Sequence, residues 1–233
     1  MSTEFQVAKV LQALKKYKRK YIKKQYNDLD ESATRIMINA FLTEVLGYQE
    51  LDEIKTEYNI RGEYADYVIQ LARKKQFVVE VKSIQIDISD KHLRQSLSYA
   101  ANEGIDWIIL TNGRNFQFYR VMFEKPIKSV LLIDIVLENA TPNDLKNCAS
   151  NIVSFTKNGV QKNEPEQFWQ RSIALSPVNI SKLLYCEDVL RVVRRELKKS
   201  TGIYFDDVSI KDALINTIHC AVDNGNIRYK TKR

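Results

Sequence analysis

The chain has 233 residues, 44% of them hydrophobic, with only 7 glycines and 4 prolines, so it can fold as one or two domains and contains little linker-like sequence. Its net charge of +7 fits a polyanionic partner, although charge bears on association and not on fold. The three cysteines show no close pairing pattern, and no apolar stretch has the length of a signal peptide or a membrane span. These features predict a cytoplasmic protein with reduced thiols and no membrane partner.

Residues 1–30 predict a basic amphipathic helix. Residues 5–27 contain many lysines and arginines and no acidic side chain, and apolar residues recur at helical spacing from Val7 to Tyr21. The basic face is either a solvated surface or a surface that contacts phosphates, and both interpretations remain open.

Residues 31–139 predict a mixed α/β core, because the apolar periodicity changes from helical spacing to alternation. The expected elements, in chain order, are a helix at 31–46 that stops at Gly47, strands at 54–60, 64–71 and 77–83, a helix at 90–102, and strands at 106–111, 116–122 and 129–136. Asn112-Gly113 predicts a tight turn between two of these strands. The expected fold is therefore a central mixed sheet flanked by helices.

The remaining residues, 140–233, predict a helical C-terminal region. Ser176-Pro177 reads as an N-cap followed by proline at the first helical position, and residues 183–197 and 208–222 are strongly helical in pattern. Basic residues gather in the stretch 190–199, where a phosphate-contacting role and a solvated helix face are both consistent with the sequence.

One short strand, FVVEVKS at 77–83, carries two charges among apolar residues. Glu80 and Lys82 are two positions apart and therefore point to the same face of a strand. If the preceding strand pairs with it as a hairpin, Asp66 comes close to Glu80. Two carboxylates on one face need compensation, and Mg²⁺ commonly binds one or two carboxylates together with water and phosphate oxygens. The set Asp66, Glu80 and Lys82 therefore suits metal-assisted phosphodiester hydrolysis, whereas the plain alternative is a surface ion pair.

Several motifs in this order resemble the PD-(D/E)xK nuclease superfamily, and in particular the N-terminal nuclease domain of type I restriction enzyme R subunits. They are FLTEVLGY, ADYVI, VEVKS, the pair Gln95 and Tyr99 in QSLSY, and ILTNGRNFQFY, and together they cover residues 31–122. The resemblance implies a restriction-endonuclease-like core.

The resemblance also implies roles for individual residues. Asp66 and Glu80 would hold Mg²⁺, or alternatively Mn²⁺, with help from the carbonyl of Val81, and Lys82 would position or activate the attacking water. Glu44 would reach the site from its helix as a supporting acid or a further ligand. Gln95 and Tyr99, four apart on one helix face, would contact the DNA backbone or support the catalytic residues.

Two departures limit the comparison. Position 65 is alanine where the superfamily motif has proline, and the sequence contains no Gly-Lys-Ser or Gly-Lys-Thr, hence no P-loop and no ATP site. The expected function is a metal-dependent DNA endonuclease without the motor of a complete R subunit, either a stand-alone relative or a fragment. Two alternatives stay open: a DNA-binding module that does not cleave alone, and a regulatory or interaction subunit. DNA and restriction-modification subunits are the expected partners, and a homodimer would suit cleavage of both strands.

Overall fold

The computed structural model describes residues 3–60 and 63–217, which divide into two compact units, one reaching to Gln167 and the other beginning at Phe168. The first unit contains the helices α1 (Glu4–Tyr21), η1 (Lys24–Tyr26), α2 (Glu31–Ala40), η2 (Phe41–Val45), α3 (Glu50–Glu53), α4 (Asp90–Glu103), α5 (Pro142–Ile152), η3 (Val153–Phe155) and α6 (Lys157–Gln161), and the strands β1 (Ile54–Ile60), β2 (Glu63–Leu71), β3 (Lys74–Val81), β4 (Trp107–Thr111), β5 (Asn115–Met122) and β6 (Lys128–Val136).

The strands form one sheet in the order β1-β2-β3-β4-β5-β6. Among the described strands, only β3 and β4 run parallel, and α4 is the crossover that joins them, whereas the other neighbouring strands pair antiparallel. This is the α/β core with a mixed sheet that the sequence predicts, so the expected fold class is confirmed.

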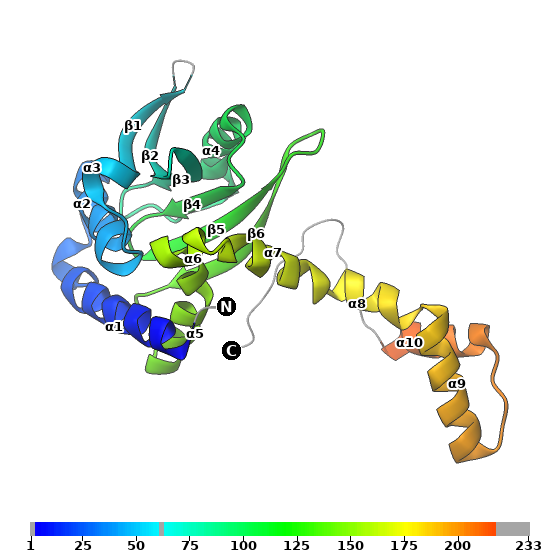
Figure 1. Ribbon diagram of the computed structural model, residues 1–233. Helices are drawn as coiled ribbons and strands as arrows, with labels where there is room; N and C mark the ends of the chain where they lie inside the picture. Colours follow the sequence, from blue (N-terminus) through cyan, green and yellow to red (C-terminus); the bar gives the residue numbers. More distant parts are fainter. Residues whose placement is uncertain (1–2, 61–62, 218–233) are drawn as a thin grey trace. The chain divides into compact units, whose positions relative to one another are not determined.

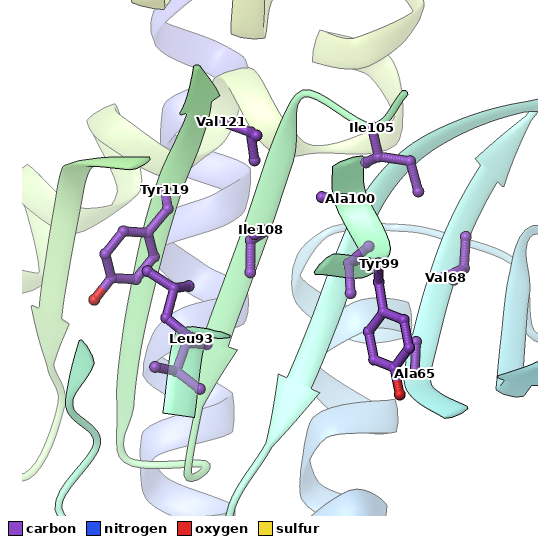
Figure 2. Packing of buried hydrophobic residues seen from close by; sticks show 11 residues of the cluster. Ala65, Val68, Leu93, Tyr99, Ala100, Ile105, Ile108, Tyr119 and Val121 are labelled. Carbon is purple, nitrogen blue, oxygen red and sulfur yellow. The ribbon is translucent and has the colours of Figure 1, made fainter. Parts of the chain in front are cut away.

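Helices cover both faces of the sheet, with α4 on one side and α1 and η2 on the other (Figure 1). Because strand residues alternate between faces, Val78, Ile108 and Leu110 pack under α4 against Tyr99 and its neighbours (Figure 2). On the opposite face, aromatic rings fill the layer: Tyr17 of α1 meets Phe41 and Phe116, and Phe155 meets Phe77, Trp107 and Phe118.

Most expected boundaries shift by one residue, and two larger differences have a local cause. The strand expected at 77–83 begins at Lys74, because the turn before it consists only of Ala72 and Arg73, both at positive φ (47° and 66°). The helix expected at 31–46 changes pitch at Phe41, where a wider π-type turn, η2, completes it. The turn expected at residues 61–62 lies outside the described residues.

The second unit is helical, as expected from its sequence, but the helix expected at 183–197 is divided between α8, which ends at Leu184, and α9, which begins at Glu187. Helix α7 (Glu164–Ala174) runs from the end of the first unit into the second, and α8 (Pro177–Leu184), α9 (Glu187–Thr201) and α10 (Asp207–Thr217) follow. Ser176 caps α8 by accepting the backbone N–H of Asn179 at 3.2 Å, which confirms the expected N-cap. The helix expected at 208–222 is described as far as Thr217, and its remainder lies outside the described residues.

Candidate active site

The candidate site lies where β2 and β3 part. Their paired register ends at Tyr67 and Val79, and Lys82 already donates its backbone N–H to Thr111 of β4 at 2.9 Å. Asp66 precedes Tyr67 in the chain and lies just beyond this last pair, and its Oδ2 accepts the backbone N–H of Val81 at 2.7 Å. The side chain thus satisfies an amide that would otherwise be buried without a partner.

A pocket of about 410 Å³ opens at this fork. It is lined by Glu31 and Arg35 of α2, Glu57 of β1, Ala65 and Asp66 of β2, Glu80 of β3, Lys82 just after β3, and Gln95 of α4. Asp66 and Glu80, at 8% and 3% exposure, are buried at its floor. The hairpin therefore brings Asp66, Glu80 and Lys82 to one pocket, as the period of two and the antiparallel pairing predict.

Strand β1 contributes Glu57 through a local distortion. Glu57 has a φ of 47°, in the left-handed region that residues with a Cβ rarely adopt. Its neighbours Thr56 and Tyr58 pair with Tyr67 and Ala65, but Glu57 itself has no partner in the described register. The distorted strand puts this largely exposed carboxylate at the pocket rim.

Helix α2 points its first turns into the pocket. Asp30 caps the helix by accepting the N–H of Ala33 at 2.7 Å, which starts the helix at Glu31. Arg35, one turn later, forms an ion pair with Oδ1 of Asp66 and lies 3.4 Å from both Glu31 and Glu57. The hydroxyl of Tyr67 donates to the carbonyl of Arg35 at 2.9 Å and fixes the helix backbone to β2.

Glu80 is held from both sides. Its Oε1 accepts a hydrogen bond from Nζ of Lys82, and its Oε2 accepts one from the buried hydroxyl of Ser96 of α4 at 3.3 Å. Burial raises the pKa of the Glu80 carboxyl, and the charge of Asp66 adds to this, although Lys82 and Ser96 act in the opposite direction. Because burial and Asp66 destabilise the ionised form of Glu80, this site favours the binding of additional positive charge.

Lys82 keeps its proton at neutral pH. Burial lowers its pKa, but the hydrogen bond to Glu80 and the charges of Glu80, Glu31 and Asp66 outweigh burial, so the pKa is raised above the ordinary value. An ammonium in this state can donate hydrogen bonds to a water or a phosphate oxygen.

Gln95 and Tyr99 lie on one face of α4, as their spacing predicts. Gln95 lines the pocket, and its amide donates to the hydroxyl of Tyr99 at 2.7 Å. The ring of Tyr99 is fully buried in the layer under α4, near Ala65 (Figure 2). Of the two roles expected for the pair, this burial suits Tyr99 to supporting Gln95, and the exposed position suits Gln95 to contacting a ligand.

The structure does not bring Glu44 to the pocket. Its carboxylate pairs instead with Lys16 at 2.8 Å and Lys20 at 3.5 Å, both on α1. The hydrogen bond from Lys16, foremost, and the charge of Lys20 lower the pKa of Glu44. Glu44 thus joins η2 to α1 on the other side of the sheet from α4.

The acidic side chain that the first core helix does supply is Glu31, and the sequence motifs did not predict Glu31, Arg35, Glu57 or Ser96 at the site. Glu31 and Arg35 carried a readable signal, because a Glu and an Arg four apart behind the N-cap Asp30 indicate a charged helix face. Nothing in the sequence pattern singled out Glu57, since its role follows from a backbone distortion.

The oxygen donors of the pocket suit a divalent cation that also binds water and phosphate. Among the described residues, no group of three or more His, Cys, Asp or Glu side chains is placed to hold a metal ion. Magnesium, however, is commonly bound by one or two carboxylates with water and phosphate completing its octahedron. Asp66 and Glu80 meet that requirement in number and chemistry, and Arg35 and Lys82 occupy the carboxylate oxygens that a cation would use.

The basic helix α1 is anchored in the layer opposite α4. Tyr17 donates to the carbonyl of Gly113 at 2.9 Å, and Lys18 donates to that of Ala140 at 2.7 Å. Lys16 and Lys20 pair with Glu44, so part of the basic face serves intramolecular contacts, while Lys9, Lys15, Arg19, Lys23 and Lys24 are exposed.

In the described part of the chain, no helix is long and apolar enough to cross a membrane.

A comparison with protein families finds a match over residues 30–133 to the family described as type I restriction enzyme R protein N terminus. The match covers the whole pocket, because every residue that lines it falls between positions 31 and 95. The expected resemblance to the N terminus of type I restriction enzyme R proteins is thereby confirmed for this segment. Neither the comparison with curated proteins nor that with solved structures gives a match.

Proposed function

We propose that this chain, whose residues 30–133 match the N-terminal domain of type I restriction enzyme R proteins, is a metal-dependent deoxyribonuclease of a restriction system. The observation that carries the proposal is the convergence of Asp66, Glu80 and Lys82 on one pocket within the matched segment. The relation to restriction systems also supports DNA and restriction-modification subunits as partners.

The charge of the pocket supports one divalent cation. Glu31, Glu57, Asp66 and Glu80 contribute four negative charges and Arg35 and Lys82 two positive ones, which leaves −2 in the ionised state. One Mg²⁺ or Mn²⁺ ion would neutralise this excess. Asp66 and Glu80 would hold the ion, together with the carbonyl of Val81. Such an ion lowers the pKa of a bound water and stabilises charge on a phosphoryl oxygen.

Each side chain then has a distinct part in phosphodiester hydrolysis. Lys82, protonated beside Glu80, donates a hydrogen bond that orients the attacking water or stabilises the charge that develops on the phosphate. Ser96 holds the second oxygen of Glu80, and the amide of Val81 holds Asp66, so both carboxylates are fixed before substrate arrives. Gln95, supported by Tyr99, contributes a polar group at the pocket wall.

A second candidate is favoured by one specific observation. Both buried carboxylates are already neutralised, Asp66 by Arg35 and Glu80 by Lys82. Paired charges of this kind also occur as structural networks. The same domain could therefore serve as a DNA-binding module or an interaction subunit that does not cleave DNA.

The deciding experiment compares two lysines, Lys75 within β3 and Lys82 directly after its end. Lys82→Ala removes the partner of Glu80, and Lys75→Ala removes the partner of Glu103, with side-chain exposures of 21% and 23%. Supercoiled plasmid is incubated with each protein and Mg²⁺ or Mn²⁺. We expect wild type and Lys75→Ala to cleave and Lys82→Ala to lose at least about 100-fold in rate, or about 2.7 kcal/mol of transition-state stabilisation.

The alternatives give different results. Equal cleavage by wild type and Lys82→Ala would exclude this pocket as the active site. Salt-dependent DNA binding without cleavage by wild type would support the binding module. If the protein neither binds nor cleaves DNA, the interaction subunit is the better assignment.

A further inference from the structure

We propose that Arg35 exchanges partners when a divalent cation enters the pocket, leaving Asp66 for Glu31 and Glu57. The inference rests on the proposed function, since the cation is the one proposed for that site. In this view Arg35 is a positioning residue that neutralises Asp66 until the cation replaces it.

The first reason is that both oxygens of Asp66 are occupied. Oδ2 accepts the backbone N–H of Val81, a contact that belongs to the framework of β3. Oδ1 is therefore the oxygen that can be freed for a ligand, and it is paired with the Arg35 guanidinium. A cation that binds Asp66 must displace Arg35, because a guanidinium and a divalent cation repel one another at a shared oxygen.

The second reason is that Arg35 has other carboxylates within reach. Its terminal nitrogens lie 3.4 Å from Oε1 of Glu31 and 3.4 Å from Oε1 of Glu57, at the outer limit of a hydrogen bond. The side chains of Glu31 and Glu57 are 42% and 73% exposed and have room to close on the guanidinium. The unusual φ of Glu57 keeps that carboxylate at the rim.

The third reason is that Arg35 is incompletely satisfied where it is. Among the described residues, its Nε is one of the buried side-chain nitrogens without a hydrogen-bond partner. The hydrogen bond from Tyr67 fixes the backbone of Arg35. The exchange therefore needs only a rotation of the Arg35 side chain, and helix α2 does not move. An unpaired donor beside two exposed carboxylates fits a residue with two positions.

The test measures Mn²⁺ affinity by isothermal titration calorimetry, without DNA. Arg35→Ala removes the competing guanidinium and is expected to bind Mn²⁺ about tenfold more tightly than wild type, since the broken contact is a charge-assisted hydrogen bond. Arg94→Ala is the matched control, because it removes the same charge from an exposed position on α4 next to Gln95. It is expected to change the affinity by less than about twofold, because exposed charges are screened.

A second measurement uses wild-type protein and does not depend on how the variants fold. The Arg35 Nε–Hε resonance, assigned by its loss in Arg35→Lys, is followed by NMR during titration with diamagnetic Mg²⁺. We expect it to shift and to saturate at the Mg²⁺ concentration at which the calorimetric binding curve for Mg²⁺ saturates.

The outcomes separate this inference from the function on which it rests. Equal or weaker Mn²⁺ binding by Arg35→Ala, or an unmoved Arg35 resonance while Mg²⁺ binds, overturns the exchange and leaves the nuclease proposal standing. If Arg35→Ala and Arg94→Ala increase the Mn²⁺ affinity equally, the increase is an effect of net charge, and the partner exchange is overturned. Absence of Mn²⁺ binding in wild type and both variants refutes the metal site and the exchange together.

Discussion

Asp66 accepts the backbone N–H of Val81 at 2.7 Å, so a side chain of β2 replaces the main-chain partner that β3 loses where the two strands part. The same carboxylate pairs with Arg35 of α2 through its other oxygen. Asp66 thus both completes the backbone hydrogen bonding where β2 and β3 separate and contributes negative charge there. A loss of activity in an Asp66 variant must therefore be separated from a loss of structure.

Asp66→Asn should separate the two contributions of this carboxylate. The amide oxygen can still accept from Val81, but the charge facing Arg35 is lost, so we expect unfolding free energy to fall by about 2 kcal/mol. Asp66→Ala loses both contacts and should cost more. In an Arg35→Ala background, Asp66→Asn should cost less by at least about 1 kcal/mol, since the charge pair is already gone. Urea denaturation measures all five proteins, and equal costs of Asp66→Asn in both backgrounds would show that the pair contributes nothing to stability.

Glu31 and Glu44 should differ in their effect on cleavage. Glu31 lines the pocket, and Glu44 pairs with Lys16 and Lys20 of α1. We expect Glu31→Gln to lower the plasmid cleavage rate by about tenfold or more, because it removes a charge beside Lys82 and Arg35. Glu44→Gln should leave the rate unchanged and reduce stability by less than about 1 kcal/mol, as for other exposed ion pairs. A larger loss of cleavage rate in Glu44→Gln than in Glu31→Gln would instead assign Glu44 to the active site.

Ser96→Ala should weaken catalysis more than folding. The Ser96 hydroxyl donates to Oε2 of Glu80 at 3.3 Å, and its loss frees one oxygen of that carboxylate. We expect the cleavage rate to fall by about tenfold while unfolding free energy changes by at most about 1.5 kcal/mol. The control is Ser98→Ala, on the exposed side of the same helix. Identical rates for the two variants would show that Ser96 has no part in positioning Glu80.

Tyr67→Phe tests the contact that fixes α2 to β2. Burial raises the pKa of the Tyr67 hydroxyl from its ordinary value to about 12. The unfolded chain therefore loses this proton first, and the folded protein should lose stability as pH rises from about 10 to about 12. At neutral pH, where the hydroxyl donates to the carbonyl of Arg35, the substitution should cost about 1 kcal/mol. Denaturation at pH 8 and at alkaline pH should show the stability difference from wild type shrinking with rising pH.

Much of the core follows from short-range pattern. The strand alternation, the Asn112-Gly113 turn and the Ser176-Pro177 cap each depend on residues within a few positions of one another, and the structure confirms the elements they predict. The period of two also accounts for Glu80 and Lys82 on one face, and the hairpin register for Asp66 beside them. These relations are local because strand geometry fixes them once two neighbouring strands pair.

Only the tertiary structure decided which acid of the first core helix faces the pocket. Glu31 and Glu44 are separated by about 20 Å of helical rise, so a single pocket cannot hold both, and the sequence pattern does not say which end of the helix lies over the fork. Docking of α1 against η2 takes Glu44 away, and the hydrogen bond from Tyr67 to Arg35 brings the other end in. Glu57, placed by a distorted strand, and Ser96, placed by the packing of α4, likewise depend on long-range contacts. The sequence determined which side chains could form the site, and the packing of helices on the sheet determined which of them do.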